Sequence, residues 1–476
     1  MASERPNVLL FMMDTQSARN MSCYGYHRET TPNIDRLAAE GVLFQNHFVT
    51  APWTLPVHSS LFTGRYESGH GAGAQHEGLE PGLPSLPEVM TRNGYRTAGF
   101  CNNGWAMADD EWNPARGFEE QVRYGGLDAV PPFVPSDDPA EKDKGSLKLV
   151  GIVKDWLDRN ATGDRPFFLF VHNGEPHNAY TPPEPFRSRF LAEGVTYEEA
   201  VAIRGHQVDS TIGIRNLSFR EWEIERSLYD GATACLDHRI GLLLEVLQEK
   251  GLLDDTLFLV TGDHGDTQGE HVGHAYHSQN GIWDTVIKTP LVARLPGAFD
   301  GGVVCTELVQ IVDIFPTLLQ LLELNEPEAA ASIQGASLLE ALKGPVREFA
   351  LAECQTPKHV FKRVWSMHPD QDVRWLNEAL KAARTLKYKY IWSSVGRDML
   401  FDIENDPDEQ CNIIGRKPEV ARELQQELEE LLMSMEQRYY QDMYRPGRPK
   451  IDAKAIRRLA AWGLYQPGIV SPWTDD

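Results

Sequence analysis

The sequence predicts an α/β fold in which a large, mostly parallel sheet is sandwiched by helices, with a smaller C-terminal α+β subdomain. Apolar runs of strand length alternate with amphipathic helical stretches through the first two thirds of the chain, as is typical of parallel sheets. Several of these runs are followed directly by polar residues, and from about residue 350 the pattern changes to short alternating runs and one long helix. At 476 residues, the chain is long enough for roughly two or three domains.

Five apolar runs have the length and composition of buried strands. They lie at residues 8–13 (VLLFMM), 97–100 (TAGF), 167–171 (FFLFV), 257–260 (LFLV) and 291–294 (LVAR). Three stretches between them place apolar residues at helical spacing and end at a glycine: 34–41 (IDRLAAEG), 85–94 (SLPEVMTRNG) and 236–252 (LDHRIGLLLEVLQEKGL). Because ligands collect at the carboxyl ends of parallel strands, the polar residues that follow a strand are the first candidates for a site.

The last third of the chain predicts a separate, smaller unit. KYKYIWSS (387–394) and MLFDIENDPDEQCN (399–412) have the pattern of strands around a turn, and EVARELQQELEELLMSMEQRYY (419–440) has the pattern of a helix. We expect a catalytic α/β domain over residues 1–345, a C-terminal α+β subdomain over 346–434 and a basic arm over 435–476. The arm is expected to pack on the body or on another subunit of a homo-oligomer.

Composition limits the kinds of molecule that the protein is expected to bind. The net charge of -23, from 69 acidic and 46 basic residues, argues against nucleic acid and anionic membranes, because the long-range field would repel either. No window approaches the roughly 18 uninterrupted apolar residues of a membrane span, and MASERPN leads into the first apolar run without a basic leader or a cleavage site. We therefore expect a soluble, cytoplasmic protein whose six cysteines, which form no CxxC, are reduced thiols.

Two of the predicted strands lead into residues that suit a metal. Asp14 follows the first run, and Asp263 and His264 follow the run at 257–260 in LFLVTGDHGD. Taken alone, Asp14 equally suits the cap of a following helix, and a capping aspartate beside a surface histidine is the alternative for the second pair. A buried carboxylate beside an imidazole is costly unless it is paired or metal-bound, and one oxygen and one nitrogen ligand suit a divalent transition metal.

Thr54 lies near the start of WTLPVHSSLFTGRY (53–66), a segment with the pattern of a helix N-terminus. A threonine followed by Pro56 is what an N-cap looks like, and the local pattern alone favours that interpretation. The functional interpretation makes Thr54 a nucleophile, because a helix N-terminus and a metal together stabilise an alkoxide and bind an incoming anion.

Five of the 15 histidines fall in two short loops after predicted strands. They are His172 and His177 in FVHNGEPHNAYTPP, and His271, His274 and His277 in GEHVGHAYH. Such clusters suit donors to a phosphate or sulfate, or ligands of a second metal. Asn103, in GFCNNGW, is a further candidate for contact with a substrate oxygen, and a turn asparagine is its alternative.

These segments, in this order, resemble the sulfatase family of the alkaline phosphatase superfamily. RPNVLLFMMDTQSARNMSCYGYHRETTPNIDRLAAEGVLFQNHFVTAPWTLPVHSSLFTGRY is similar to the family's N-terminal signature. FFLFVHNGEPHNAYTPP, YDGATACLDHRIGLLLEVLQEKGLLDDTLFLVTGDHGDTQGEH, TPLVARLPG and VDIFPTLLQLL are similar to later blocks, and KYKYIWSSVGRDMLFDIENDPDEQCN to the C-terminal subdomain. The resemblance covers roughly residues 5–430 and implies an alkaline-phosphatase-like fold and a metal-dependent hydrolase of ester bonds.

Two segments depart from the pattern of that family. Classical sulfatases have Cys-x-Pro-x-Arg, whose cysteine becomes formylglycine, where this chain has TLPVH at 54–58, so the resemblance implies no formylglycine here. The classical pair of aspartates after the first strand is Asp14-Thr15 in this chain. What remains is similar to the sites of lipoteichoic acid synthase and the phosphoethanolamine transferases, relatives that attack phosphorus through threonine, and to phosphonate and phosphodiester hydrolases.

The resemblance implies a complete candidate site. Asp14, Thr54, Asp263 and His264 would hold the metal; Thr54, His58, His177 and His277 would be catalytic; Asn103, His172 and His274 would contact the substrate, with His274 also a candidate for the place given to His277. Mn²⁺ or Zn²⁺ suits three oxygens and one imidazole better than Mg²⁺ or Ca²⁺ does.

The favoured hypothesis is hydrolysis of a phosphate or phosphonate ester of an anionic small molecule, with Thr54 attacking phosphorus. His177 and His277 would hold the non-bridging oxygens or protonate the leaving group. Three alternatives stay open: a sulfate-ester hydrolase that works without formylglycine, a transferase, and a non-catalytic member of the family that binds a metal or an anion.

Overall fold

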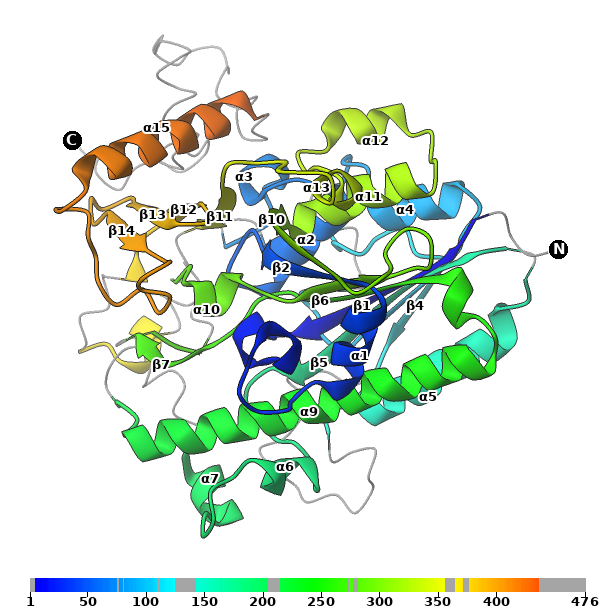
Figure 1. Ribbon diagram of the computed structural model, residues 1–476, viewed down its shortest axis with the longest axis horizontal. Helices are drawn as coiled ribbons and strands as arrows, with labels where there is room; N and C mark the ends of the chain where they lie inside the picture. The colour runs from blue at the N-terminus through cyan, green and yellow to red at the C-terminus, as the bar shows by residue number, and fades with distance from the viewer. Residues whose placement is uncertain are drawn as a thin grey trace.

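A computed structural model describes residues 5–74, 77–79, 81–108, 112–124, 143–163, 165–203, 215–271, 274–276, 281–355, 364–370 and 376–435. At its centre lies an eight-stranded sheet with the order β10-β2-β9-β6-β1-β5-β3-β4 (Figure 1). Its strands are β1 (Asn7–Asp14), β2 (Val42–Phe48), β3 (Arg96–Cys101), β4 (Glu120–Arg123), β5 (Phe167–Pro176), β6 (Thr256–Gly262), β9 (Leu291–Arg294) and β10 (Val303–Gln310). Only β9 is antiparallel to its neighbours among these strands, so the predicted mostly parallel sheet is confirmed.

Helices cover both faces of this sheet, because the central strands bury side chains on both sides. Along β1, Val8, Leu10 and Met12 join one apolar core and Leu9, Phe11 and Met13 join the other. The first core includes side chains of α2 (Thr54–Thr63), α4 (Leu86–Arg92) and α11 (Ile314–Leu321), and the second those of α1 (Pro32–Glu40), α5 (Ser146–Asn160) and α9 (Phe219–Glu249). A strand buried on both faces reads as an unbroken apolar run, which is why VLLFMM lacks polar alternation.

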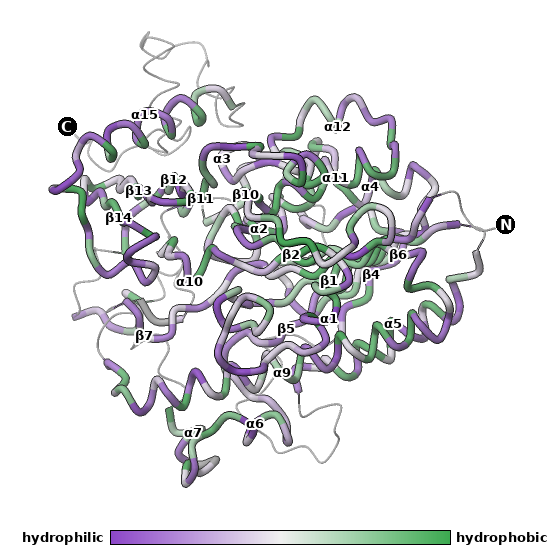
Figure 2. Tube along the Cα trace, viewed as in Figure 1, coloured by the Kyte–Doolittle hydropathy of each residue, from purple (hydrophilic) through white to green (hydrophobic). Residues whose placement is uncertain are grey.

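The covering helices differ in polarity from the strands that they cover. Figure 2 shows hydrophilic and hydrophobic residues alternating along α5 and α9, whereas the central strands are mainly hydrophobic. Shorter helices and turns complete this part of the chain: η1 (Ala18–Asn20), η2 (Ser22–Tyr24), α3 (Glu67–His70), α6 (Phe186–Arg189), α7 (Tyr197–Ile203), η4 (Leu253–Asp255), α10 (Asp284–Ile287), η5 (Ile311–Asp313), α12 (Pro327–Ser332) and α13 (Leu338–Ala341).

A second, antiparallel sheet forms the C-terminal part of the described chain. It contains β11 (Ala350–Cys354), β12 (Leu380–Arg384), β13 (Tyr388–Ser393) and β14 (Met399–Asp402), in that order, and α15 (Pro418–Ser434) packs against it. Leu424, Leu428 and Leu432 of α15 belong to the same apolar core as Val8 of β1, so the two sheets share one core. The predicted α+β character is confirmed, and residues 436–476 of the expected arm lie outside the described residues.

The sequence pattern missed several strands, each for a local reason. β2 passes from VLF to the polar QNH, β4 is only EQVR, and the exposed Val303 and Val304 of β10 lie at the sheet edge. A hairpin of β7 (Thr267–His271) and β8 (His274–Tyr276) follows the DHG segment and was also missed. Edge strands and short hairpins bury too little apolar surface to leave a clear pattern.

Two expectations from composition can be compared with the described residues. Within them, we find no helix that combines the length and the apolar character needed to cross a membrane. All six cysteines lie in the described part of the chain, and none of them forms a disulfide.

A buried charge network joins the C-terminal sheet to α10. Lys389 Nζ lies 2.9 Å from Asp284 Oδ1 and 2.7 Å from Glu409 Oε1, and Arg384 Nε donates to Asp284 Oδ2 at 2.9 Å. Burial alone would raise the pKa of Asp284, but Arg384 and Lys389 hold it well below its usual value. Burial raises the pKa of Glu409 to about 7. The ammonium of Lys389 therefore stabilises two carboxylates that are largely removed from water.

Replacing Lys389 with methionine should lower the free energy of unfolding by about 3 kcal/mol, because both carboxylates lose this cation. The loss should be larger at about pH 8 than at about pH 6. Since the folded-state pKa of Glu409 is raised, protonation relieves its buried charge at low pH, and stability falls as the pH rises through that pKa. Urea unfolding at both pH values measures the effect. Lys387→Met is the control, because Lys387 is exposed and its pair with Glu404 spans 3.4 Å; equal losses in the two variants would contradict the prediction.

Candidate active site

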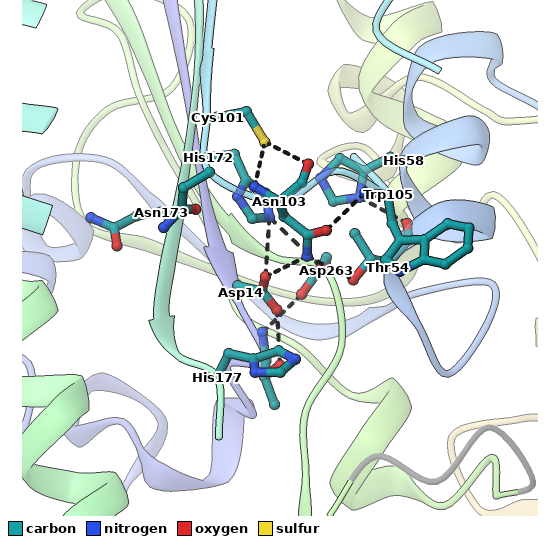
Figure 3. Close-up of polar contacts among 12 residues, drawn as sticks. Asp14, Thr54, His58, Cys101, Asn103, Trp105, His172, Asn173, His177 and Asp263 are labelled. Atoms are coloured by element: carbon teal, nitrogen blue, oxygen red, sulfur yellow. Dashed lines mark hydrogen bonds and ion pairs between the residues drawn. The ribbon is translucent and has the colours of Figure 1, made fainter. Parts of the chain in front are cut away.

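The predicted site residues meet at the carboxyl ends of neighbouring strands (Figure 3). Asp14 is the last residue of β1, which pairs with β5 on one side and β6 on the other. Asp263 and His264 follow β6, His172 lies in β5, and Asn103 follows β3. Because parallel strands end at the same edge of a sheet, four segments far apart in the sequence contribute to one buried cluster.

Hydrogen bonds from neighbouring backbone and side-chain groups orient the carboxylates of Asp14 and Asp263. Asp263 Oδ1 accepts from the backbone N–H groups of Thr15 at 2.9 Å and His264 at 2.8 Å. Asp14 accepts at Oδ1 from Thr15 Oγ1 at 2.9 Å and at Oδ2 from Asn103 Nδ2 at 2.8 Å. Burial alone would raise the pKa of Asp263, but neighbouring His264 and His172 hold it well below its usual value. Both carboxylates are thus oriented by fixed donors, which suits a charged ligand set.

Thr15, which stands where the resemblance places a second aspartate, shapes the turn after β1. Its φ of 66° lies in the left-handed region, which a β-branched residue rarely adopts. This conformation accompanies the bond from its N–H to Asp263 Oδ1. Tyr229 of α9 holds the same turn: its hydroxyl donates to Thr15 O at 2.7 Å and accepts from Ser17 N at 2.9 Å. The strain is therefore maintained by contacts on both sides of Thr15.

Thr54 is the first residue of α2, and the N-cap position belongs to Trp53. No side-chain capping bond is present at this N-terminus, so the capping interpretation of Thr54 is wrong. The Thr54 hydroxyl instead accepts from Asn103 Nδ2 at 3.3 Å and lies 3.5 Å from His264 Nε2. A capping side chain folds back over its own helix. The side chain of Thr54 contacts the strand-end cluster instead.

His264 has the tautomer that leaves one nitrogen lone pair for the site. Its Nδ1 lies 3.2 Å from Gly265 O, a carbonyl that can only accept, so Nδ1 carries the proton. Nε2 lies 3.7 Å from Asp263 Oδ2 and 3.9 Å from Asp14 Oδ1. Ligating histidines are commonly oriented by such a backbone contact through the other ring nitrogen.

His58 and His172 lie beside each other in the same cluster, next to Asp263. His58 is on the second turn of α2, where its Nδ1 donates to Thr54 O at 2.8 Å. Its ring centroid is 5.1 Å from that of His172, and both side chains are fully buried. Burial, together with the charge of His172, lowers the pKa of His58 to about 4, so its ring is neutral near pH 7.

The structure describes the other predicted histidines only in part. His177 directly follows β5 and is half-buried, with its Nδ1 hydrogen-bonded to Asn178 O (Figure 3). His274 lies in β8 opposite His271, and its side chain is not among those described. His277 lies outside the described residues. The structure therefore brings together six of the predicted residues around Thr54: Asp14, His58, Asn103, His172, Asp263 and His264.

The strand-end residues fit a divalent cation. Asp14, Asp263 and His264 each offer one ligand atom, and these atoms lie within 4.8 Å of one another. All three side chains are fully buried, and Asp263 Oδ2 has no hydrogen-bond partner. Two carboxylates this close, with an orphaned oxygen in a buried site, need a positive charge between them. The Thr54 hydroxyl lies beside them, 3.5 Å from His264 Nε2.

Sequence reasoning missed Asn173, Cys101 and Trp105, which Figure 3 draws around this cluster. Asn173 follows His172 in β5, and its buried Nδ2 has no hydrogen-bond partner. Cys101 Sγ donates to Asn103 O at 3.2 Å, and Asn103 Oδ1 accepts from Trp105 N at 2.9 Å. The position of Asn173 just after the apolar run FFLFV is a signal that the sequence does contain. The other two contacts depend on how the loop after β3 folds.

Comparisons with known proteins agree with this architecture. The family model described as Sulfatase matches residues 6–324, and that described as N-sulphoglucosamine sulphohydrolase, C-terminal, matches residues 269–438. The chain is similar to an ulvan-active sulfatase of Formosa agariphila, with 27% identity over 89% of this chain and 80% of the relative. An N-acetylglucosamine-6-O-sulfatase of Bacteroides thetaiotaomicron is 24% identical over 96% of this chain and 90% of its own length.

Solved structures show the same fold. A phosphonate monoester hydrolase of Agrobacterium radiobacter superposes with a TM-score of 0.70 and 23% identity, over 90% of this chain and 95% of that chain. At this level of identity, the superposition shows that the two proteins share one fold. More narrowly, since the first family model matches more than half of the chain, this protein belongs to the sulfatase family.

Family membership confirms the predicted resemblance and the predicted class of enzyme, a metal-dependent hydrolase of ester bonds. At the level of the substrate, the curated relatives quoted above are sulfatases. The comparisons thus favour the sulfate-ester alternative over the hypothesis of a phosphate or phosphonate ester.

Proposed function

We propose that this protein hydrolyses a small anionic ester with Thr54 as the nucleophile. The observation that carries the proposal is the position of the Thr54 hydroxyl: it lies at the N-terminus of α2, 3.5 Å from His264 Nε2 and 3.3 Å from Asn103 Nδ2, beside the buried carboxylates. That this hydroxyl makes no capping bond and lies beside metal-type ligands supports a role as nucleophile.

Each residue of the site has a distinct task in the proposed reaction. Asp14, Thr54, Asp263 and His264 would hold a divalent cation, Mn²⁺ or Zn²⁺, which lowers the pKa of a bound hydroxyl and offsets the charge of a bound anion. Asn103 orients Thr54, because its amide donates to both Asp14 Oδ2 and Thr54 Oγ1. The backbone N–H groups of the first turn of α2 face the incoming anion.

The reaction proceeds in two displacements. Thr54 Oγ attacks the central sulfur or phosphorus atom, and the bond to the ester oxygen breaks as the alcohol leaves with a proton. Water then attacks the threonine ester, which releases the inorganic anion and restores the hydroxyl. We propose His177 and His277 as the groups that protonate the leaving oxygen or hold the non-bridging oxygens, and His172 and His274 as further contacts of the anion.

A sulfate ester is the first substrate class to test. The family model and the curated relatives support it, since the relatives are named for sulfated substrates. A phosphate or phosphonate ester is the second class, and one observation favours it: Thr54 and His58 stand where classical sulfatases have a formylglycine precursor and its arginine. Threonine cannot be converted to the aldehyde hydrate that formylglycine provides.

Steady-state assays on 4-nitrophenyl sulfate, phosphate monoester, phosphate diester and phenylphosphonate separate these classes. We expect turnover of at least one ester, and the highest kcat/KM identifies the central atom. A preference for the sulfate ester supports the first class, and a preference for a phosphorus ester supports the second. Stoichiometric metal with no turnover of any of the four would instead favour the non-catalytic alternative.

We also propose that the protein works in the cytoplasm. None of its six cysteines forms a disulfide, and Cys411 is exposed to solvent. Exposed thiols suit a reducing compartment. Fractionation of the native host would test this, and recovery in the periplasmic or culture fraction would contradict it.

A further inference from the structure

A second group of metal-type ligands lies beside the first and uses different side chains. His58, His172 and Asp263 each offer one ligand atom, and these atoms lie within 4.8 Å of one another. All three side chains have no exposed surface. His58 comes from α2, His172 from β5, and Asp263 directly follows β6 (Figure 3). The group therefore joins a covering helix to two strands of the central sheet.

The atoms that face one another in this group have no hydrogen-bond partner. His58 Nε2, both ring nitrogens of His172, and Asp263 Oδ2 are buried and accept or donate no hydrogen bond. The charged groups nearest to them are more distant: His172 Nε2 lies 3.5 Å from Asp14 Oδ2, and Asp263 Oδ2 lies 3.7 Å from His264 Nε2. His58 Nδ1 donates to Thr54 O, so its Nε2 presents a bare lone pair. Asp263 Oδ1 already accepts two backbone N–H groups, which leaves Oδ2 as the oxygen turned towards the imidazoles. Buried polar atoms without hydrogen-bond partners are rare and costly, and such atoms from three neighbouring residues indicate a missing ligand.

A proton alone does not account for this arrangement. A protonated His172 would pair with the carboxylates, since its Nε2 lies 3.5 Å from Asp14 Oδ2 and 4.0 Å from Asp263 Oδ2. The lone pair of His58 Nε2 would still have no donor, and the imidazolium would lie against a second imidazole. A divalent cation would bind one of these atoms from each of the three residues. Two imidazoles with one carboxylate are typical ligands of Zn²⁺ and also suit Mn²⁺.

We propose that His58, His172 and Asp263 hold a second divalent cation, with Asp263 shared between this site and the one formed by Asp14, Thr54 and His264. The proposal rests on the first site of the proposed function, because Asp263 belongs to both. It also accounts for the change of arginine to His58 relative to the family pattern. A guanidinium carries a permanent charge and cannot bind a cation, whereas a neutral imidazole can.

Metal content measured on the full chain tests this proposal without any assay of activity. Protein expressed with added Zn²⁺ and Mn²⁺ and passed through gel filtration should hold about two cations per chain by elemental analysis. His172→Ala and His58→Gln should each hold about one, and so should Asp14→Asn, which removes a ligand of the first site only. Asp263→Asn should reduce occupancy of both sites.

Two controls keep the result interpretable. His47→Gln removes another fully buried histidine whose Nε2 is also unpaired, but His47 contacts Thr289 rather than the site, so this variant should keep about two cations. Circular dichroism confirms that each variant is folded. In Mn²⁺-loaded protein, two cations that share a carboxylate should give an exchange-coupled electron paramagnetic resonance signal, and His172→Ala should give the signal of isolated Mn²⁺.

One cation per wild-type chain, unchanged in folded His172→Ala and His58→Gln, would overturn the second site. That result is separable from failure of the proposed function. Two cations in a protein whose Thr54→Ala variant retains full turnover would support the second site and overturn the nucleophile. One cation with an inactive Thr54→Ala variant would do the reverse.

Discussion

Replacing Thr54 with alanine is expected to reduce kcat/KM by about 10⁴-fold or more, because the attacking oxygen is removed while the rest of the site is kept. Thr54→Ser should retain measurable turnover, since it keeps the hydroxyl that lies 3.5 Å from His264 Nε2. The measurement is kcat/KM on the best ester of the panel described above. Mass spectrometry of quenched wild-type protein should also find the sulfated or phosphorylated form of the peptide that contains Thr54.

Thr63→Ala is a matched control for this variant. Thr63 is the last residue of α2 and is buried like Thr54. Its hydroxyl donates to Ser59 O at 2.6 Å. Its loss should change kcat/KM by less than about 3-fold, because it removes a threonine hydroxyl from the same helix without touching the site. Full turnover by a folded Thr54→Ala protein would contradict the mechanism, and an adduct on another residue would move the nucleophile elsewhere.

The fold could be predicted because burial on both faces leaves unbroken apolar runs in the central strands. β1, β5 and β6 are such strands, and the residues that follow or end them, including Asp14 and Asp263, could be selected by their position alone. β9 also has an apolar run, but its antiparallel direction depends on its partners in the sheet, β2 and β6, and not on its own composition. Edge strands such as β4 left no readable pattern because they bury little.

The roles within the site could be predicted only in part from local pattern. The sequence could not decide whether Thr54 caps α2, since a capping threonine and a nucleophile at a helix start share the same neighbours. The structure gives the N-cap position to Trp53, which excludes the capping role alone. The contact between His58 and His172 joins segments more than a hundred residues apart, and no spacing rule predicts it. The left-handed Thr15 is likewise a product of its contacts with Asp263 and Tyr229.

Removing bound metal is expected to abolish turnover and to destabilise the protein. A chelator should reduce kcat/KM by about 10³-fold or more, since the cation is needed to form the alkoxide and offset the anion's charge. The melting temperature should fall as well, because a cation at about 1,000 times its Kd contributes about 4 kcal/mol to the folded state. Differential scanning calorimetry and kcat/KM, measured on the same chelated sample, test both effects.

Adding single cations back to the chelated protein distinguishes the candidate metals, and a ligand variant assigns the lost activity to a named residue. Zn²⁺ or Mn²⁺ should restore activity and melting temperature, whereas Ca²⁺ should restore little, because the imidazole of His264 is a poor ligand for a cation that prefers all-oxygen sites. Asp14→Asn, with the same shape but one charge fewer, should reproduce the loss of activity and respond weakly to added metal, whereas the Thr63→Ala control should respond like the wild type. Asp14 and Asp263 meet in a buried cluster, so their negative charges must be balanced. A metal-free protein that stayed fully active would mean that protons balance these charges, and it would contradict the proposed metal site.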